Sequence, residues 1–121
     1  MHATSKVCMR KDVGLNGNLF GGNMLAWMDE ASYAFVVTIT NGKYTFVTKK
    51  FGEIVFLKPV KEGDVVHINC GNVVVGDTSI SFDVSAVSNR GQVFKTSAVF
   101  VALDENGKKM TIDKDMVNTV E

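Results

Sequence analysis

Residues 22–37 read GNMLAWMDEASYAFVV and predict one long helix. The segment has no proline and no glycine after its first residue, and the polar residues 38–42 end it. About 16 residues at 1.5 Å each give a helix roughly 24 Å long. Apolar side chains go nearly all the way round, which predicts burial on most sides, as for a central helix wrapped by a sheet. They are Met24, Leu25, Ala26, Trp27, Met28, Ala31, Ala34, Phe35, Val36 and Val37.

The rest of the chain has the pattern of β-strands. In residues 79–86, Ile80, Phe82 and Val84 alternate with small or polar residues at a period of two. Further strands are expected at residues 5–10, 44–57, 64–75 and 92–103. Short turns between consecutive strands require antiparallel pairing. The order predicts an α+β fold, in which a curled antiparallel sheet of about five strands wraps one helix.

The composition bounds the organisation and the partners. A chain of 121 residues is too short for two domains, so residues 1–121 are expected to form one. Thirteen basic and thirteen acidic residues cancel and form no basic stripe, so we expect no nucleic-acid partner. Near-zero net charge also favours self-association.

Cysteine usage and the termini favour a cytoplasmic protein. Cys8 and Cys70 belong to no metal-binding cluster and are expected to be buried and reduced. The first residues lack the apolar run of a signal peptide, and no segment is apolar enough to span a membrane. We therefore expect no membrane partner and no metal.

A glycine-rich loop leads into the helix. Residues 14–23 read GLNGNLFGGN, and first-turn amides such as those of Gly21 and Gly22 have no partner inside the helix while carrying the positive end of its dipole. Such amides suit an oxyanion or a polarised carbonyl. The glycines are equally compatible with a purely steric role, and no P-loop signature follows them.

Asp29 is the sharpest chemical signal in the helix. Leu25, Met28, Asp29, Ser32 and Phe35 fall near one another on the helix at spacings of three and four. We therefore expect Asp29 on a stripe that points into the protein, facing the helix amides. A partly desolvated carboxylate gains basicity, which suits a general base or a nucleophile. A structural hydrogen bond or a subunit border is the alternative. His2 and His67 have no partner at a motif spacing, so no Ser-His or Cys-His device is expected.

Several spaced motifs resemble one enzyme family. The runs NLFGG (18–22), WMDEA (27–31), FLKP (56–59) and GDVV (63–66) occur in the order found in the YciA-like branch of hotdog-fold acyl-CoA thioesterases, and the similarity covers nearly the whole chain. The resemblance implies a hotdog fold, a homodimer as the minimum unit, and a homohexamer built as a trimer of dimers. It also implies hydrolysis of acyl-CoA, with coenzyme A as part of the substrate and no separate cofactor.

The resemblance implies roles for individual residues. Asp29 is the general base or nucleophile, the amides of Gly21 and Gly22 polarise the thioester carbonyl, and a loop of the opposite subunit completes the site. Gly14 stands where the family commonly has an asparagine, and Asn16 and Asn18 are the candidates to replace it. The residues implied to contact coenzyme A are Lys58, Gly76, Thr78, Ser79, Lys108 and Lys109. Asp77 departs from a family position that is often basic, and a solvated turn is the alternative for the two C-terminal lysines.

Three hypotheses follow. Thioester hydrolysis leads. A non-catalytic acyl-CoA binder is favoured by the departures at Gly14 and Asp77. A dehydratase is disfavoured because the helix has no histidine. Acyl preference stays open, since Trp27, Tyr33 and Phe35 suit either a substrate tunnel or an ordinary core.

Overall fold

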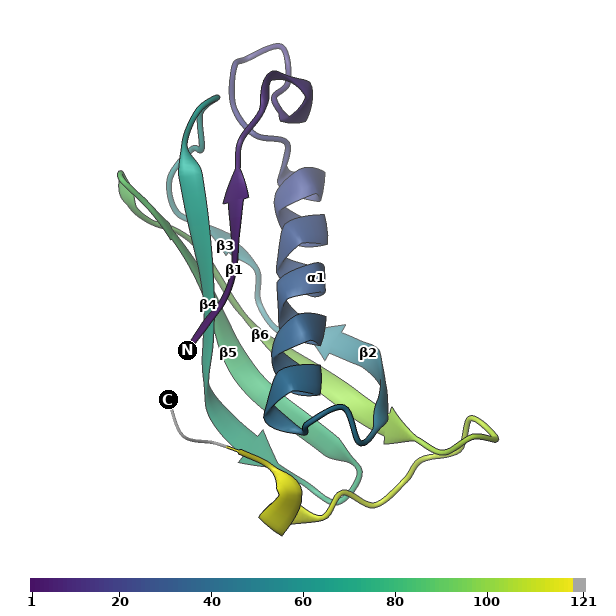
Figure 1. Cartoon of the computed structure of the whole chain (residues 1–121). Coiled ribbons are helices and arrows are strands. Elements are labelled where there is room, and N and C mark those ends of the chain that lie inside the picture. Colours follow the sequence, from purple (N-terminus) through teal and green to yellow (C-terminus); the bar gives the residue numbers. More distant parts are fainter. Residues whose placement is uncertain (119–121) are drawn as a thin grey trace.

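The computed structural model describes residues 1–118 and confirms the α+β architecture. Its elements are β1 (His2–Val7), η1 (Arg10–Asp12), α1 (Gly21–Ile39), β2 (Thr45–Phe51), β3 (Val55–Phe56), β4 (Val65–Val75), β5 (Ser79–Ser88), β6 (Gly91–Leu103) and η2 (Lys114–Met116). The strands form one antiparallel sheet in the order β1-β4-β5-β6-β2, and β3 shares the β6 edge with β2. Helix α1 lies along this sheet (Figure 1).

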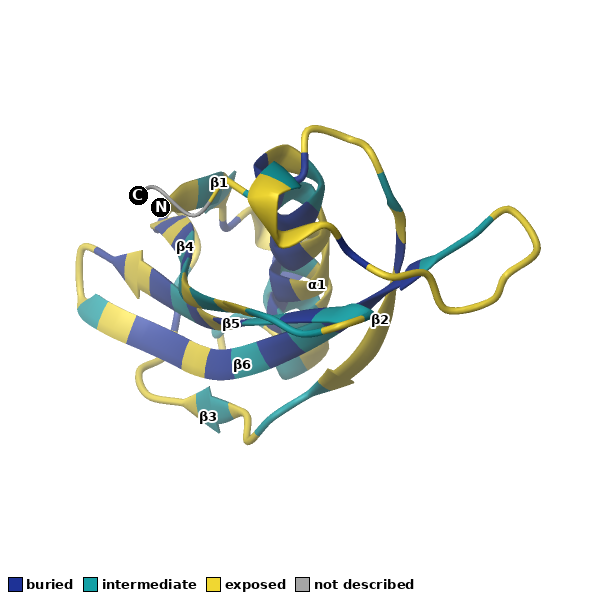
Figure 2. Ribbon diagram, turned by 90° about the horizontal axis from the view of Figure 1, so that it is seen from below, coloured by how far each residue is buried: buried dark blue, intermediate teal, exposed yellow. Residues whose placement is uncertain are grey.

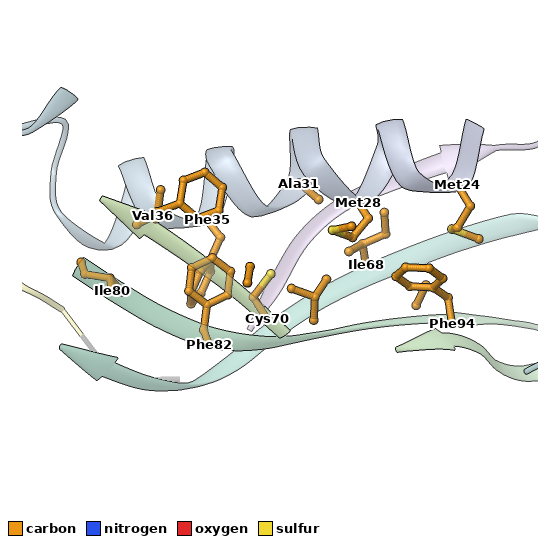
Figure 3. Close-up of a cluster of buried hydrophobic side chains, with 14 of the residues drawn as sticks. Met24, Met28, Ala31, Phe35, Val36, Ile68, Cys70, Ile80, Phe82 and Phe94 are labelled. Atoms are coloured by element: carbon orange, nitrogen blue, oxygen red, sulfur yellow. The ribbon is translucent and has the colours of Figure 1, made fainter. Parts of the chain in front are cut away.

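One face of α1 packs on the sheet. Its buried stripe consists of Met24, Met28, Ala31, Phe35 and Ile39, each at most 3% exposed. Figure 3 shows several of these side chains pointing into a cluster with Ile68, Phe82 and Phe94 from the strands. Full burial of a side chain of this size contributes about 1.5–3 kcal/mol, so the stripe anchors the helix.

The other face of α1 is open in a single chain. This open face consists of Gly22, Ala26, Asp29, Glu30 and Tyr33, all of them exposed. Figure 2 shows the sheet curling around one side of the helix only. The expectation of burial on most sides is therefore wrong for the isolated chain, because the sheet is too narrow to enclose the helix.

The alternating pattern of β5 is confirmed. Ile80, Phe82, Val84 and Ala86 are buried, and the residues between them face outward. Cys8 and Cys70 are both buried and free, as predicted.

Two expected strands differ from the structure. The strand predicted at residues 5–10 ends at Val7, because the Asp12 carboxylate accepts from the Met9 amide at 2.9 Å and closes a turn. The strand predicted at residues 44–57 splits into β2 and β3. Between the two strands, Gly52 lies so close to β6 that a Cβ at this position would clash with the Ser97 hydroxyl. Only glycine fits this close approach, and the regular strand is interrupted there.

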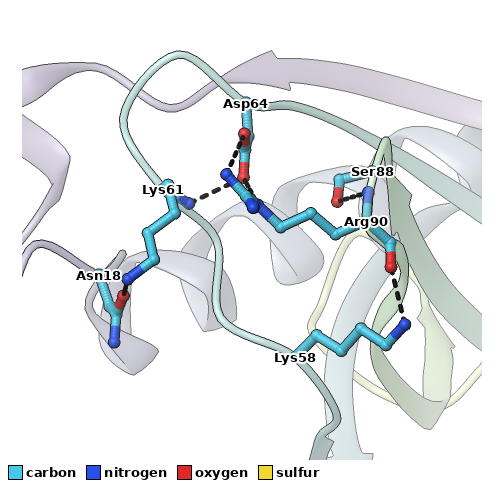
Figure 4. A network of polar contacts seen from close by, with 6 residues as sticks. All are labelled: Asn18, Lys58, Lys61, Asp64, Ser88 and Arg90. Atoms are coloured by element: carbon cyan, nitrogen blue, oxygen red, sulfur yellow. Dashed lines mark hydrogen bonds and ion pairs between the residues drawn. The ribbon is translucent and has the colours of Figure 1, made fainter.

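A buried carboxylate holds the loop before β4. Asp64 is 7% exposed and accepts from Arg90 Nε at 2.8 Å and from the Lys61 amide at 2.9 Å (Figure 4). Hydrogen bonding from Arg90, and then from the Lys61 backbone, lowers the pKa of Asp64 below its usual value. The pair thus joins the loop at residue 61 to the β5–β6 turn.

Replacing Asp64 with Asn should destabilise the fold by about 1–3 kcal/mol at pH 7, because Arg90 and the Lys61 amide lose the charged acceptor that Asp64 provides. The folded pKa of Asp64 is lowered, so its contribution is present above the unfolded pKa, about 3.9, and is lost as the pH falls through the folded value. Urea unfolding from pH 7 to pH 3 measures this. The exposed carboxylate of Asp83 provides the control, D83N. An equal loss of stability in both variants, or a D64N deficit independent of pH, would contradict the assignment.

Candidate active site

The first turn of α1 presents unpaired amides. The N-cap residue is Phe20, which has no side-chain acceptor, so the helix start is not capped from within. Among residues 1–118, the amides of Gly21 and Gly22 have no hydrogen-bond partner. A Cβ at Gly22 would meet nothing within 4 Å, so the chain leaves open space beside this residue. The helix start can therefore accept an anionic oxygen.

Lys61 fixes the loop that carries these amides. Its ammonium group donates to Asn18 Oδ1, and the Leu19 amide donates to the Val60 carbonyl at 2.8 Å. The Asp64–Arg90 pair holds the backbone of Lys61 in turn (Figure 4). On the other side, the Asp12 carbonyl accepts from Phe20 N and Asn23 Nδ2. The glycine-rich loop is thus held at both ends.

A cavity beside the helix start collects four of the predicted site residues. It has a volume of about 350 Å³ and brings together Asn16, Asn18, Gly21 and Lys58. Its other walls are largely apolar and are formed by Leu19, Met24, Phe56, Leu57, Pro59, Val60 and Val93. This mixture of apolar surface with a few polar groups is typical of sites for small molecules.

The two candidates for the missing asparagine have structural hydrogen bonds. Asn16 Oδ1 accepts from the Asn18 amide at 3.0 Å, and Asn18 Oδ1 accepts from Lys61. Neither side-chain nitrogen has a partner among the described residues. At Gly14 itself, a Cβ would lie 3.1 Å from the Phe20 ring, so that ring occupies part of the space a side chain would need. A catalytic role for either asparagine stays a prediction.

Asp29 lies in a different place from the one expected. It is exposed on the open face of α1, because it follows Met28 of the buried stripe by one residue, or about 100°. Its carboxylate accepts from Thr48 Oγ1 of β2 at 3.1 Å. The two residues line a groove of about 380 Å³ between α1 and β2, together with Ala26, Glu30 and Tyr33. The expectation that Asp29 points into the protein is therefore wrong, although it does line a groove.

The carboxylate and the amides do not meet within one chain. Asp29 comes seven positions after Gly22 in the sequence. At 1.5 Å per residue, the two lie about 10.5 Å apart along a rigid helix. A reacting carbonyl touches its base or nucleophile and its oxyanion donors within about 3 Å. The expectation that Asp29 faces its own helix amides is therefore wrong.

The remaining predicted residues lie at the far end of the helix. Gly76, Thr78 and Ser79 form the β4–β5 turn, and Lys108 and Lys109 belong to the turn after β6 (Figure 1). Backbone bonds join the two segments, since Ile112 N donates to the Asp77 carbonyl at 2.7 Å. Lys58 and the glycine-rich loop lie at the opposite end. The structure thus divides the predicted coenzyme A contacts into two groups that one chain does not bring together.

Two polar contacts were missed from the sequence. Thr48 is separated from Asp29 by 19 residues, and only the pairing of β2 with β6 aims it at the helix. Ser5 Oγ bonds both His2 Nε2 at 2.8 Å and His67 Nδ1 at 2.7 Å. Within residues 1–118, no carboxylate bonds to this exposed trio. A Ser-His device needs such a carboxylate to orient the imidazole.

The described part of the chain has neither a metal-binding cluster nor a membrane-spanning helix. Residues 1–118 contain no group of three or more His, Cys, Asp or Glu side chains placed to hold a metal ion. In the same part of the chain, α1 and the short helices are not long and apolar enough to cross a membrane.

The family follows from comparison with known proteins. The profile of the thioesterase superfamily matches residues 16–95, which include most of the glycine-rich loop, Asp29 and Thr48. The chain belongs to the thioesterase superfamily. Within it, the acyl-CoA thioester hydrolase YciA of Escherichia coli (strain K12) is 33% identical over 111 residues, which cover 84% of this chain and 83% of that protein.

Solved structures confirm the hotdog fold. A hexameric hotdog fold thioesterase of Campylobacter jejuni is 27% identical, with a TM-score of 0.83 over 95% of this chain and 92% of that one. A hexameric thioesterase from Yersinia pestis is 25% identical, with a TM-score of 0.86 over 94% of this chain and 96% of that one. The superfamily and the fold predicted from the sequence are thus both confirmed.

Replacing Lys61 with Met should loosen the glycine-rich loop without unfolding the protein. A hydrogen bond worth about 1 kcal/mol corresponds to roughly fivefold faster hydrogen exchange at the Leu19 amide. Exchange followed by NMR or mass spectrometry measures this, with the exposed Lys95→Met as the matched control. Unchanged exchange across residues 14–20 in K61M would show that Lys61 does not fix the loop.

Proposed function

We propose that the chain hydrolyses acyl-CoA thioesters to a carboxylic acid and coenzyme A. The observation that carries this proposal is the exposed Asp29 carboxylate, held by Thr48 at 3.1 Å in the groove between α1 and β2. A carboxylate with a fixed orientation and an open approach can act on a substrate. Relatives named as acyl-CoA thioester hydrolases support the same chemistry.

The proposed site needs two copies of the chain. Because Asp29 lies about 10.5 Å along the helix from its own amides, we place the Asp29 of one protomer opposite the Gly21 and Gly22 amides of its partner. A homodimer is then the smallest active unit. Its interface would cover exposed apolar side chains outside the groove, including Val47 and Phe56, which are 44% and 53% exposed. Assembly of three dimers into a hexamer is proposed from the hexameric relatives.

Asp29 could drive hydrolysis of the thioester by either of two routes. As general base, Asp29 takes a proton from water while the water oxygen adds to the thioester carbon. As nucleophile, it adds to that carbon itself, and water then hydrolyses the acyl-aspartyl anhydride. In both routes the amides stabilise the oxyanion, the C–S bond breaks, and the leaving thiolate takes a proton. Thr48 keeps the carboxylate aimed in both cases.

Coenzyme A is assigned to the cavity at the helix start. The cavity is lined by the side-chain amides of Asn16 and Asn18, which suit the polar pantetheine arm of coenzyme A. The Lys58 ammonium group, which also lines it, suits a phosphate. Lys58 is held by the Arg90 carbonyl at 2.8 Å, so its charge is fixed beside the cavity. The lysines at the far end, Lys108 and Lys109, would reach the nucleotide only from another protomer.

Replacing Asp29 with Asn should lower kcat by at least about 100-fold, because removing a general base or nucleophile forfeits a factor of this size. Thiol release from a panel of acyl-CoAs measures the rate, and D83N on β5 is the matched carboxylate control. Thermal unfolding should show that both variants stay folded. Native activity in D29N would refute the role of Asp29. Acyl-CoA binding with no thiol release by the wild type would favour the non-catalytic binder.

A complementation test examines whether the site is shared. Gly22→Pro removes one amide at a position where a helix bonds no N–H internally, so D29N and G22P should each be inactive while folded. In mixed dimers of the two variants, one site carries both defects and the other carries none, so activity should reappear on mixing. If each site belonged to one chain, every mixed dimer would stay inactive.

A further inference from the structure

An exposed aromatic ring lies one helical turn beyond Asp29. Tyr33 is 48% exposed, lines the same groove and follows Asp29 by four residues, a spacing that makes side chains neighbours on a helix. At the other end of the groove, Ala26 presents only a methyl group. The groove beside Asp29 is therefore lined by a methyl group before the carboxylate and by an aromatic ring one turn after it.

The Tyr33 ring contacts the buried aromatic core. Its centroid lies 6.5 Å from that of Phe100, with the rings tilted by 52°. Phe100 is fully buried and stacks on Phe82 at 5.8 Å, and Phe82 packs on Phe35 at 4.8 Å. Figure 3 shows Phe35 and Phe82 facing each other between α1 and the sheet. This column supports the inner side of the Tyr33 ring, because the core behind it is close-packed.

The same register that aims Thr48 also places Tyr33. Thr48 and Phe100 are direct cross-strand partners of β2 and β6, so their side chains share the sheet face toward the helix. Thr48 contacts Asp29, and Phe100 contacts Tyr33. Two neighbours on the helix thus meet two neighbours on the sheet, which fixes the ring relative to the carboxylate.

We infer that Tyr33 sets the size of the acyl group that the site accepts, favouring short, neutral acyl chains. This inference rests on the proposed function. With coenzyme A assigned to the cavity of Lys58, the acyl group occupies the groove beside Asp29, and the Tyr33 ring limits how far it extends. A long chain has to pass a ring that the aromatic column holds in place.

The charges in the groove indicate a neutral acyl group. Asp29 and Glu30 both line it, and only Glu30 is paired, with Lys6 Nζ at 2.9 Å. An acyl chain that ends in a carboxylate would bring a further negative charge beside Asp29. Like charges in a partly desolvated groove repel, so succinyl groups are disfavoured relative to butyryl groups.

Replacing Tyr33 with Ala tests the inference. The ratio of kcat/KM for dodecanoyl-CoA to that for butyryl-CoA should rise at least about tenfold, since a single methylene in a hydrophobic pocket already changes discrimination by about 10–200-fold. Y33F keeps the ring and should leave the ratio unchanged, which separates the ring from its hydroxyl. Y33V retains an apolar cover and should give an intermediate ratio if Y33A proves unstable. Succinyl-CoA should react more slowly than butyryl-CoA with the wild type.

Failure of the Tyr33 inference can be told apart from failure of the proposed thioester hydrolysis. A wild type that releases no thiol would overturn that function, while the ratio of Kd values for dodecanoyl-CoA and butyryl-CoA would still test Tyr33 in the same variants. An unchanged ratio in Y33A and Y33V, with light scattering showing the native assembly, would overturn the inference. An equal change in Y33F and Y33A would also overturn it, because the hydroxyl and not the ring would then be responsible.

Discussion

Helix α1 can turn only one face toward the sheet, and its buried stripe determines which face that is. Met24, Met28, Ala31, Phe35 and Ile39 fill the concave side, so the residues opposite them have no cover within the chain. Asp29 and Tyr33 are exposed as a consequence of this packing. The packing of the buried stripe therefore determines where the Asp29 carboxylate lies. Rotation of the helix by one residue would bury that carboxylate and expose part of the core.

The rigidity of the same helix separates the two groups that we propose act on the thioester. A backbone amide at the helix start and a carboxylate two turns later keep a constant distance, because the backbone bonds between them do not stretch. The proposal of a site shared by two protomers rests on this constraint more than on any exposed apolar patch. In such an arrangement, self-association and activity are linked, and a variant that weakens the dimer would also lose turnover.

The sequence predicted those features that local periodicity determines. The helix was predicted at residues 22–37 and occupies Gly21–Ile39, and the alternation predicted within residues 79–86 was correct at Ile80, Phe82 and Val84. The face of Asp29 could not be predicted, because apolar residues surround the helix and the pattern alone does not show which of them meet the sheet. Thr48 and the Ser5–His67 contact depend on strand register across 19 and 62 residues, which local patterns do not encode. The split between β2 and β3 depends on the approach of Gly52 to Ser97, which is also a tertiary feature.

The two cysteines have a practical consequence for any assay of a released thiol. Burial raises the pKa of Cys70 to about 12 and, together with nearby carboxylates, raises that of Cys8. Neither side chain is then present as the reactive thiolate at neutral pH, and neither is accessible to a colorimetric disulfide reagent while the chain is folded. The native protein should give no background colour. Slow colour development without substrate would instead report the rate at which the core opens. The same reagent therefore measures both product release and the rate of unfolding.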